Sequence, residues 1–218
     1  MEKLENFIPA AHYHFLTPAY EFLARLTIGK TWRGMVQEIV EHALQGAHVT
    51  DIGCGPGTIL RNIREKRPDL ILDGFDIDPS ILKLAERKAK TMRITFAQAS
   101  TDQLPIPAQS RDIVMNNMVF HHLTTEMKRR TFDEVRRVLR PDGSFLLCDF
   151  SSFDREEKVK TLWSRLTRFF EPAVIPQMEG QLFTLAEEAG ARVELLRTYH
   201  GSMALLRCTF PQSQKMLH

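Results

Sequence analysis

The chain has 218 residues, of which 43% are hydrophobic and 26% are charged, and its formal net charge is +2. This length and composition fit one folded globular domain rather than two full domains. The small positive charge gives no support for a nucleic-acid partner, because nucleic-acid-binding domains usually carry a strong basic surplus. The three cysteines are widely spaced and form no C-x-x-C pair, so neither a disulfide framework nor a zinc cluster is expected.

No targeting or membrane-spanning segment is evident in the sequence. The first ten residues include acidic side chains and lack the long apolar core of a signal peptide. No apolar run approaches the roughly 20 residues that are needed to cross a bilayer. We therefore expect a cytoplasmic protein.

Apolar strand-like runs alternate with amphipathic helical runs along most of the chain. Residues 1–46 are predicted to be helical, with Gly29 as a break between two helices. After them the pattern predicts, in chain order, a strand at 47–52, a helix at 58–66, a strand at 70–77, a helix at 79–90, strands at 94–98 and 112–116, a helix at 125–139, a strand at 144–149, helices at 155–170 and 178–189, and strands at 193–199 and 204–210. Asp78 is a predicted helix cap and the R-P-D-G run at 140–143 a predicted turn. This alternation is typical of a parallel sheet covered by helices.

A glycine-rich loop follows the first predicted strand and precedes a helix, over residues 51–57 (D-I-G-C-G-P-G). Glycines permit a tight turn and let a ligand approach the backbone, and the helix that follows presents free N–H groups to a polar or anionic group. Asp76 ends the next predicted strand, 19 residues after Gly57, where a carboxylate can accept hydrogen bonds from ribose hydroxyls. No G-K-[ST] follows the glycines, which excludes a P-loop. From the residues alone, both a dinucleotide and S-adenosylmethionine remain possible cofactors.

Five motifs together resemble the Rossmann-like (class I) S-adenosylmethionine-dependent methyltransferases. They are D-I-G-C-G-P-G at 51–57, F-D-I-D-P-S at 75–80, D-Q-L-P-I-P at 102–107, D-I-V-M-N-N-M-V-F-H-H-L at 112–123 and V-L-R-P-D-G-S-F-L-L at 138–147. The resemblance is strong over about residues 47–150. It implies a seven-stranded, mostly parallel sheet with an antiparallel last strand pair, flanked by helices.

The resemblance also implies one methyltransferase domain. Its expected parts are an N-terminal helical cap (1–46), a cofactor-binding core (47–150), a helical lid insertion (151–178) and a C-terminal helix and strand pair (179–218).

The same resemblance assigns the residues that would hold S-adenosylmethionine. The methionine part is expected over the loop that contains Gly53, Cys54, Gly55 and Gly57. Asp51 would support that loop and the amino group of the cofactor. Asp76 would bind the ribose, Ile77 would pack on the adenine, and the backbone of Asn116 would hold the methionine end.

One position departs from the family pattern. The family usually has an aspartate followed by a small residue after the third strand, whereas this chain has Ser100 and Thr101, followed by Asp102. Both Ser100 and Thr101 are assigned to the cofactor site. A hydroxyl bonds the adenine amine more weakly than a carboxylate does.

Two segments indicate the class of methyl acceptor by resemblance. The run from Leu16 to Trp32 resembles the start of the ubiquinone/menaquinone C-methyltransferases, and the run from Tyr199 to Arg207 resembles their end. The run N-N-M-V at 116–119 differs from the [DNS]-P-P-[FYW] motif of enzymes that methylate amino groups of nucleic-acid bases. The expected acceptor is therefore a small, lipophilic molecule, and a nucleic-acid partner is not expected.

The predicted helix at 155–170 carries an apolar stripe beside several basic residues. The stripe either belongs to the core or closes a hydrophobic pocket, and in the second case the helix can also contact a membrane surface transiently. Tyr20, Trp163 and Phe170 are the predicted substrate-binding residues.

Methyl transfer needs a general base only when the acceptor must lose a proton in order to attack. Histidine suits that role near neutral pH. His121 follows the fourth predicted core strand, close to the expected position of the methyl group, and it is the first candidate; Tyr13 and His14, in the segment expected to cover the cofactor, are the others. His122 is expected to make a structural hydrogen bond. No metal ion is expected.

Three other function classes stay open at this point. An RNA or protein methyltransferase would be expected to show an added recognition domain or a concentrated basic face. A non-catalytic S-adenosylmethionine-binding protein would hold the cofactor without turnover. A dehydrogenase is disfavoured because the loop has G-x-G-x-G in place of G-x-G-x-x-G. The sequence leaves the oligomeric state open.

Overall fold

The structure is a computed structural model that describes residues 17–151, 180–199 and 203–211, with side chains from residue 29 onward. Its sheet contains β1 (His48–Ile52), β2 (Ile71–Asp76), β3 (Ile94–Gln98), β4 (Arg111–Asn117), β5 (Leu139–Phe150), β6 (Arg192–Tyr199) and β7 (Met203–Thr209). The strand order is β3-β2-β1-β4-β5-β7-β6. The first five strands pair in parallel, and β7 lies antiparallel between β5 and β6. This arrangement confirms the predicted mostly parallel seven-stranded sheet with an antiparallel last pair.

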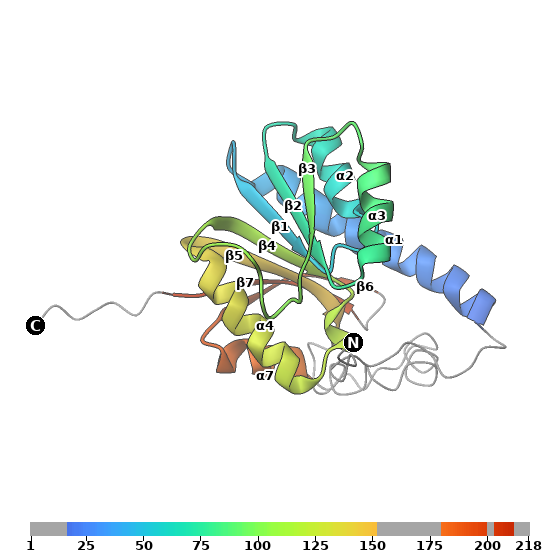
Figure 1. The fold of residues 1–218 in the computed structure, drawn as a ribbon. Helices are drawn as coiled ribbons and strands as arrows, with labels where there is room; N and C mark the ends of the chain where they lie inside the picture. Colours follow the sequence, from blue (N-terminus) through green and yellow to red (C-terminus); the bar gives the residue numbers. More distant parts are fainter. Residues whose placement is uncertain (1–16, 152–179, 200–202, 212–218) are drawn as a thin grey trace, which may run out of the picture.

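Helices cover both faces of this sheet (Figure 1). The helical elements are α1 (Thr17–His42), α2 (Thr58–Lys66), α3 (Pro79–Lys88), the 3-10 turn η1 (Phe120–His122), α4 (Thr125–Val138) and α7 (Gln181–Glu188). One core cluster joins the sheet to α1, α2 and α3, and a second joins it to α4 and α7. Because the central strands are buried on both faces, they appear in the sequence as continuous apolar runs rather than alternating ones.

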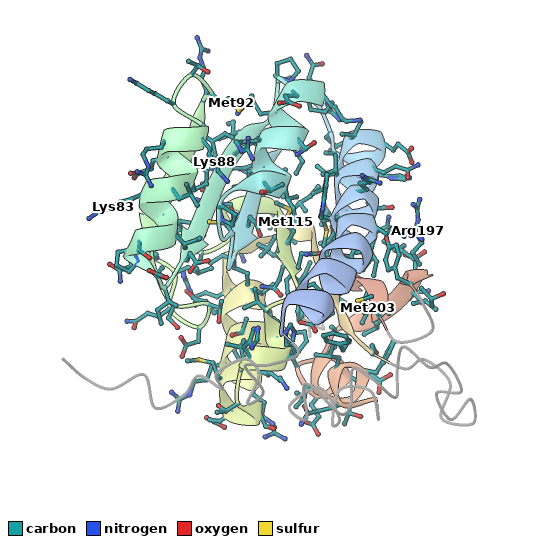
Figure 2. All side chains as sticks on the ribbon, turned by 90° about the vertical axis from the view of Figure 1, so that its right-hand side faces the viewer. Lys83, Lys88, Met92, Met115, Arg197 and Met203 are labelled. Atoms are coloured by element: carbon teal, nitrogen blue, oxygen red, sulfur yellow. The ribbon has the colours of Figure 1, made fainter. Side chains whose placement is uncertain are left out.

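Apolar side chains fill the interior of the protein, and most charged side chains lie on its surface. Figure 2 shows Met115 of β4 in the interior, whereas Lys83 extends outward from α3. Lys88 of the same helix is also exposed. The start of α3 is stabilised locally, since the Asp78 carboxylate accepts a hydrogen bond from the Ser80 N–H at 2.8 Å and Pro79 occupies the first turn. The predicted cap at Asp78 is therefore confirmed.

The predicted break at Gly29 is wrong, because α1 is one continuous helix through this residue. A glycine inside a helix costs only about 1 kcal/mol relative to alanine. Thr31, Met35 and Ile39, further along the same helix, are fully buried against the sheet. Their burial outweighs the glycine penalty.

The predicted turn at 140–143 is also revised, because these residues lie inside β5. Leu139 pairs with Arg111, and the next pair is Ser144 with Ile113, so the four residues between them form an irregularity of the strand. Gly143 passes close to β4: a Cβ atom added there would lie 3.0 Å from the carbonyl oxygen of Asp112. The strand thus begins five residues before the predicted start at 144.

Some predictions fall on other parts of the chain. The predicted lid helix at 155–170 and the first residues of the predicted helix at 178–189 lie outside the described residues. No helix in the described part of the chain is both long and apolar enough to cross a membrane.

Helix α1 is fitted to β6 at one glycine, which gives a test of the packing. A Cβ atom added to Gly34 would lie 1.8 Å from the hydroxyl oxygen of Tyr199. Gly34→Ala is expected to lower the free energy of unfolding by about 1–3 kcal/mol, as overpacking of a core does. Chemical denaturation measures this change.

Gly29→Ala is the matched control in the same helix, because its added Cβ would meet no atom closer than 3.7 Å. This variant should be neutral or stabilising by up to about 1 kcal/mol. Equal stabilities for the two alanine variants would contradict the proposed contact between Gly34 and Tyr199.

Candidate active site

The glycine loop between β1 and α2 adopts a backbone that requires its glycines. Gly53, Gly55 and Gly57 have φ angles of 75°, 52° and 67°, in the left-handed region. A Cβ atom on Gly53 would lie 2.6 Å from Val119, and one on Gly57 would lie 2.7 Å from Phe96. A Cβ on Gly55 would meet nothing within 4 Å. Two of the glycines therefore permit close packing within the protein, and the third leaves the loop open to a ligand.

Hydrogen bonds hold this loop against the end of β2. The carbonyl oxygen of Phe75 accepts the N–H groups of Gly53 (2.7 Å) and Cys54 (3.0 Å). The Asp76 carboxylate accepts the Gly55 N–H at 2.8 Å and the Asp78 N–H at 3.0 Å. The predicted ribose-binding carboxylate is thus fixed in position by the loop. Cys54 is buried, and burial raises the pKa of its thiol well above the usual range, which rules out a nucleophilic role.

A second carboxylate is buried beside the first. Asp51 is 2% exposed near the end of β1, and burial, together with the charge of Asp76, raises its pKa to about 8. A buried and a partly buried acidic group side by side favour a cation between or beside them. The amino-acid end of S-adenosylmethionine supplies one, its ammonium group.

Two amide oxygens at the end of β4 lack hydrogen-bond partners. The side-chain amide of Asn116 donates to the carbonyl oxygen of Ile52, and its Oδ1 atom is buried and unpaired. The Oδ1 atom of Asn117 is also buried and unpaired. Buried polar atoms are nearly always paired, so these oxygens fit a ligand that brings N–H donors. Asp51 and Asn117 lie on the same face of the sheet and therefore fit the ammonium group of the cofactor, whereas the Asn116 side chain lies on the other face.

The opposite end of the predicted cofactor site has an apolar surface and a hydroxyl. Ile77 is 43% exposed just after β2, which suits a residue that packs on an adenine ring. The Ser100 hydroxyl donates to the Asp102 carboxylate. Asp102 thus brings a carboxylate next to the position where the family pattern has its aspartate, and the sequence analysis did not assign it. The Thr101 hydroxyl forms a hydrogen bond with the Thr131 hydroxyl of α4 at 2.8 Å. Thr131 therefore competes with the cofactor for the hydroxyl of Thr101.

A histidine and an aspartate are paired at the ends of β4 and β5. His121 is 5% exposed and Asp149 is fully buried. The Nδ1 atom of His121 lies 2.9 Å from Asp149, which also accepts the backbone N–H of His121 at 3.2 Å and that of Phe150 at 2.7 Å. Because the carboxylate faces Nδ1, this nitrogen carries the proton and Nε2 is the basic atom. Asp149 follows a continuous apolar run, and its adjacency to η1 depends on strand order, so only the fold brings the pair together.

Other groups surround this pair. The His121 ring lies 3.9 Å from that of His122 and 5.1 Å from that of Phe150, centroid to centroid. Lys128 of α4 is 3% exposed and donates to Gln181 of α7 at 2.9 Å. Burial lowers the pKa of Lys128, and the charge of Asp149 opposes this effect. Neither Lys128 nor Asp149 was assigned to the site from the sequence.

The remaining predicted site residues are not described. Tyr13, His14, Trp163 and Phe170 lie outside the described residues, and only the backbone of Tyr20 is described, in α1. Their roles stay predictions. Among the described residues, no group of three histidines, cysteines or acidic residues could hold a metal ion.

Comparisons with known proteins agree with this geometry. Residues 49–143 match the methyltransferase domain family. The chain is 29% identical over 171 residues to the ubiquinone/menaquinone biosynthesis C-methyltransferase UbiE of Syntrophotalea carbinolica, covering 76% of this chain and 68% of that protein. It is 27% identical over 139 residues to the malonyl-[acyl-carrier protein] O-methyltransferase of Hahella chejuensis, covering 64% of this chain and 45% of that protein.

Solved structures show the same fold at low identity. A SAM-dependent methyltransferase from Aquifex aeolicus superposes with a TM-score of 0.63 at 18% identity, over 81% of this chain and 88% of that chain. The YcgJ protein of Bacillus subtilis superposes with a TM-score of 0.68 at 16% identity, over 85% of this chain and 100% of that chain.

The raised pKa of Asp51 predicts a pH-dependent cofactor affinity. Cationic cofactor groups favour the ionised carboxylate, whereas the free protein binds a proton there below about pH 8. Affinity for S-adenosylhomocysteine should therefore rise with pH between 6 and about 8, by up to tenfold per pH unit, with release of about one proton. Calorimetry in buffers of different ionisation enthalpy measures both quantities. Asp51→Asn should remove the dependence, and a variant that keeps it would exclude Asp51 as its source.

The same group also affects stability. A folded-state pKa above the unfolded value means that Asp51 lowers stability progressively as pH rises from about 4 to about 8. Asp51→Asn should therefore raise the Tm at pH 8 by at least about 2–4 °C, the change that accompanies ~1 kcal/mol in a chain of this size. A lower Tm at pH 8 would contradict the assignment of a strained carboxylate.

The ribose role of Asp76 has a direct test. Asp76→Ala should weaken S-adenosylhomocysteine binding by about 1–3 kcal/mol, because it removes charged hydrogen bonds to the ligand and to the loop. Asp78→Ala is the control, since this neighbouring carboxylate caps α3. The control should lower stability by about 1 kcal/mol and leave affinity unchanged. Unchanged affinity in Asp76→Ala would exclude the ribose role.

The fold, the open glycine loop with its acidic neighbours and the matched domain all indicate the same chemistry. The loop and the ends of β1, β2 and β4 present the acceptors that a nucleoside with a cationic amino-acid end requires. Residues 49–143 form a Rossmann-like S-adenosylmethionine-dependent methyltransferase domain, and the chain resembles the ubiquinone/menaquinone C-methyltransferases.

Proposed function

We propose that this enzyme methylates a small, lipophilic acceptor that must lose a proton during the reaction, with His121 as the general base. The buried pair of His121 and Asp149 is the observation that carries the proposal. A base held in a dry site is needed for a phenol, an enol or a ring carbon beside a hydroxyl, whereas a free amine or a thiolate needs none. The similarity to UbiE of Syntrophotalea carbinolica supports a quinone precursor as the acceptor class.

Bound S-adenosylmethionine supplies an activated methyl group that already has its leaving group. The residues of the chain then have two tasks, which are alignment and proton removal. Asp51, Asp76 and the glycine loop hold the cofactor in place. His121 receives the proton of the acceptor at Nε2 as the acceptor attacks. Asp149 keeps the ring oriented and stabilises the imidazolium that forms.

The proposal also includes a cytoplasmic location and a transient contact of residues 155–170 with a membrane surface. A macromolecular acceptor is the competing function, since a tRNA methyltransferase of Arabidopsis thaliana is 26% identical over 61% of this chain and 31% of its own length. The modest net charge of +2 favours the small molecule.

The acceptor class is tested with labelled-methyl S-adenosylmethionine and an extract of the source cells, partitioned between organic solvent and water. Enzyme-dependent label in the organic phase is expected, and mass spectrometry of that phase then identifies the product. Label only in the aqueous phase would overturn the lipophilic assignment and favour a polar metabolite or RNA.

The role of His121 is tested by substitution. His121→Asn should lower kcat by about 10²–10⁴-fold, the usual contribution of general base catalysis, without a change in S-adenosylhomocysteine affinity. Asp149→Asn should lower kcat as well, and the double variant should be no slower than His121→Asn, because the two residues act as a unit. A His121→Asn enzyme with near-normal kcat would show that the acceptor needs no base here.

A further inference from the structure

Most of the unpaired buried polar side-chain atoms among the described residues lie at one edge of the sheet. Six buried side-chain nitrogen or oxygen atoms have no hydrogen-bond partner in the described part of the chain. Two are Nε atoms of arginines in α2, and the other four belong to Asn116, Asn117, Ser151 and Tyr199. These four residues lie at or just beyond the carboxyl ends of β4, β5 and β6, which is the edge that carries the glycine loop. Such a concentration indicates a missing ligand rather than scattered defects of packing.

For three of these four residues, the structure already offers an explanation of the unpaired atom. Asn116 and Asn117 end β4, next to the proposed cofactor site. The Tyr199 hydroxyl is covered by α1, because it lies directly over Gly34. Ser151 is left, and it is 3% exposed with a buried hydroxyl.

Ser151 lies next to the catalytic pair. It directly follows Phe150, whose ring meets that of His121 edge-on with a centroid separation of 5.1 Å. Residues two apart along an extended strand share a face and are separated by about 7 Å, so Ser151 is on the same side as Asp149. An unpaired hydroxyl beside a proton-accepting histidine suits an oxygen atom on the substrate.

We infer that the Ser151 hydroxyl donates a hydrogen bond to an oxygen of the methyl acceptor, beside the proton that His121 removes. This inference rests on the proposed function and narrows it. The acceptor would carry an oxygen conjugated to the methylated atom, as in a phenol, an enol or a hydroquinone. Loss of the proton leaves negative charge on that oxygen, and a fixed O–H donor in a dry site stabilises it in the transition state.

A stability measurement distinguishes a substrate contact of the Ser151 hydroxyl from a structural contact. A hydroxyl that holds the fold would lower stability when removed, whereas an unpaired one is desolvated without compensation. Ser151→Ala should therefore have a Tm equal to or above that of the wild type. A clear fall in Tm would show that the hydroxyl has a structural partner and would overturn the inference.

The kinetic experiment uses the full chain and the extract fraction into which the wild type transfers labelled methyl. Initial rates over a dilution series of that fraction should show kcat/KM reduced by about 10–100-fold in Ser151→Ala, as for other transition-state donors. Calorimetric affinity for S-adenosylhomocysteine should not change. Ser144→Ala is the matched control, because Ser144 lies in β5, the strand that Ser151 follows, but far from its carboxyl end. It should retain the wild-type kcat/KM.

The proposed acceptor class and the proposed role of Ser151 would be refuted by different results. No transfer by the wild type into the organic phase would refute the lipophilic acceptor, and the Ser151 comparison would then be made with the aqueous fraction that accepts label. Transfer by the wild type with equal kcat/KM in Ser151→Ala would refute the role of Ser151 alone.

Discussion

The contact between the glycine loop and the end of β2 is the constraint on which the rest of the site depends. One carbonyl, that of Phe75, receives two N–H groups of the loop, and the Asp76 carboxylate receives a third. These bonds require backbone angles that glycine adopts readily, and they bring Gly53 against Val119 of the segment that leads into η1. The glycine loop is therefore packed against the segment that leads to His121, and both lie at the same edge of the sheet.

Two buried carboxylates in the neighbouring strands β1 and β2 have opposite environments. Burial acts to raise the pKa of Asp73, but bonds from His48 and Thr50 and the charge of Arg111 lower it overall. The Asp73 carboxylate thus has its hydrogen-bond partners within the protein. At the loop edge, Asp51 has a raised pKa because burial and Asp76 act in the same direction. The unfavourable electrostatics thus lie at the proposed position of the cationic ligand, which is the usual relation between stability and function at a binding site.

Local signals predicted most of the regular structure well. The helix at 58–66 and the strand at 94–98 have the predicted bounds; the helix lies between Gly57 and Pro68, and both segments show a clear apolar pattern. The predicted break at Gly29 failed because the burial of Met35 and Ile39 against the sheet outweighs a small local penalty. The predicted turn at 140–143 failed because pairing on either side, at Leu139 and Ser144, keeps these residues in the strand. In both cases a contact distant in sequence decided the outcome.

The sequence by itself determined the α/β class, the cofactor loop and the identity of the acidic residue at the end of β2, since these depend on residues close together in the chain. Tertiary structure alone decided which polar groups meet. The pairing of His121 with Asp149 spans 28 residues and exists because β4 and β5 are neighbours in the sheet. The unpaired hydroxyl of Ser151 and the raised pKa of Asp51 are properties of burial, which no local pattern encodes. The set of polar groups that meet at this edge of the sheet therefore depends on the order of the strands. That order depends on how the whole chain packs its two apolar layers of helices on one sheet.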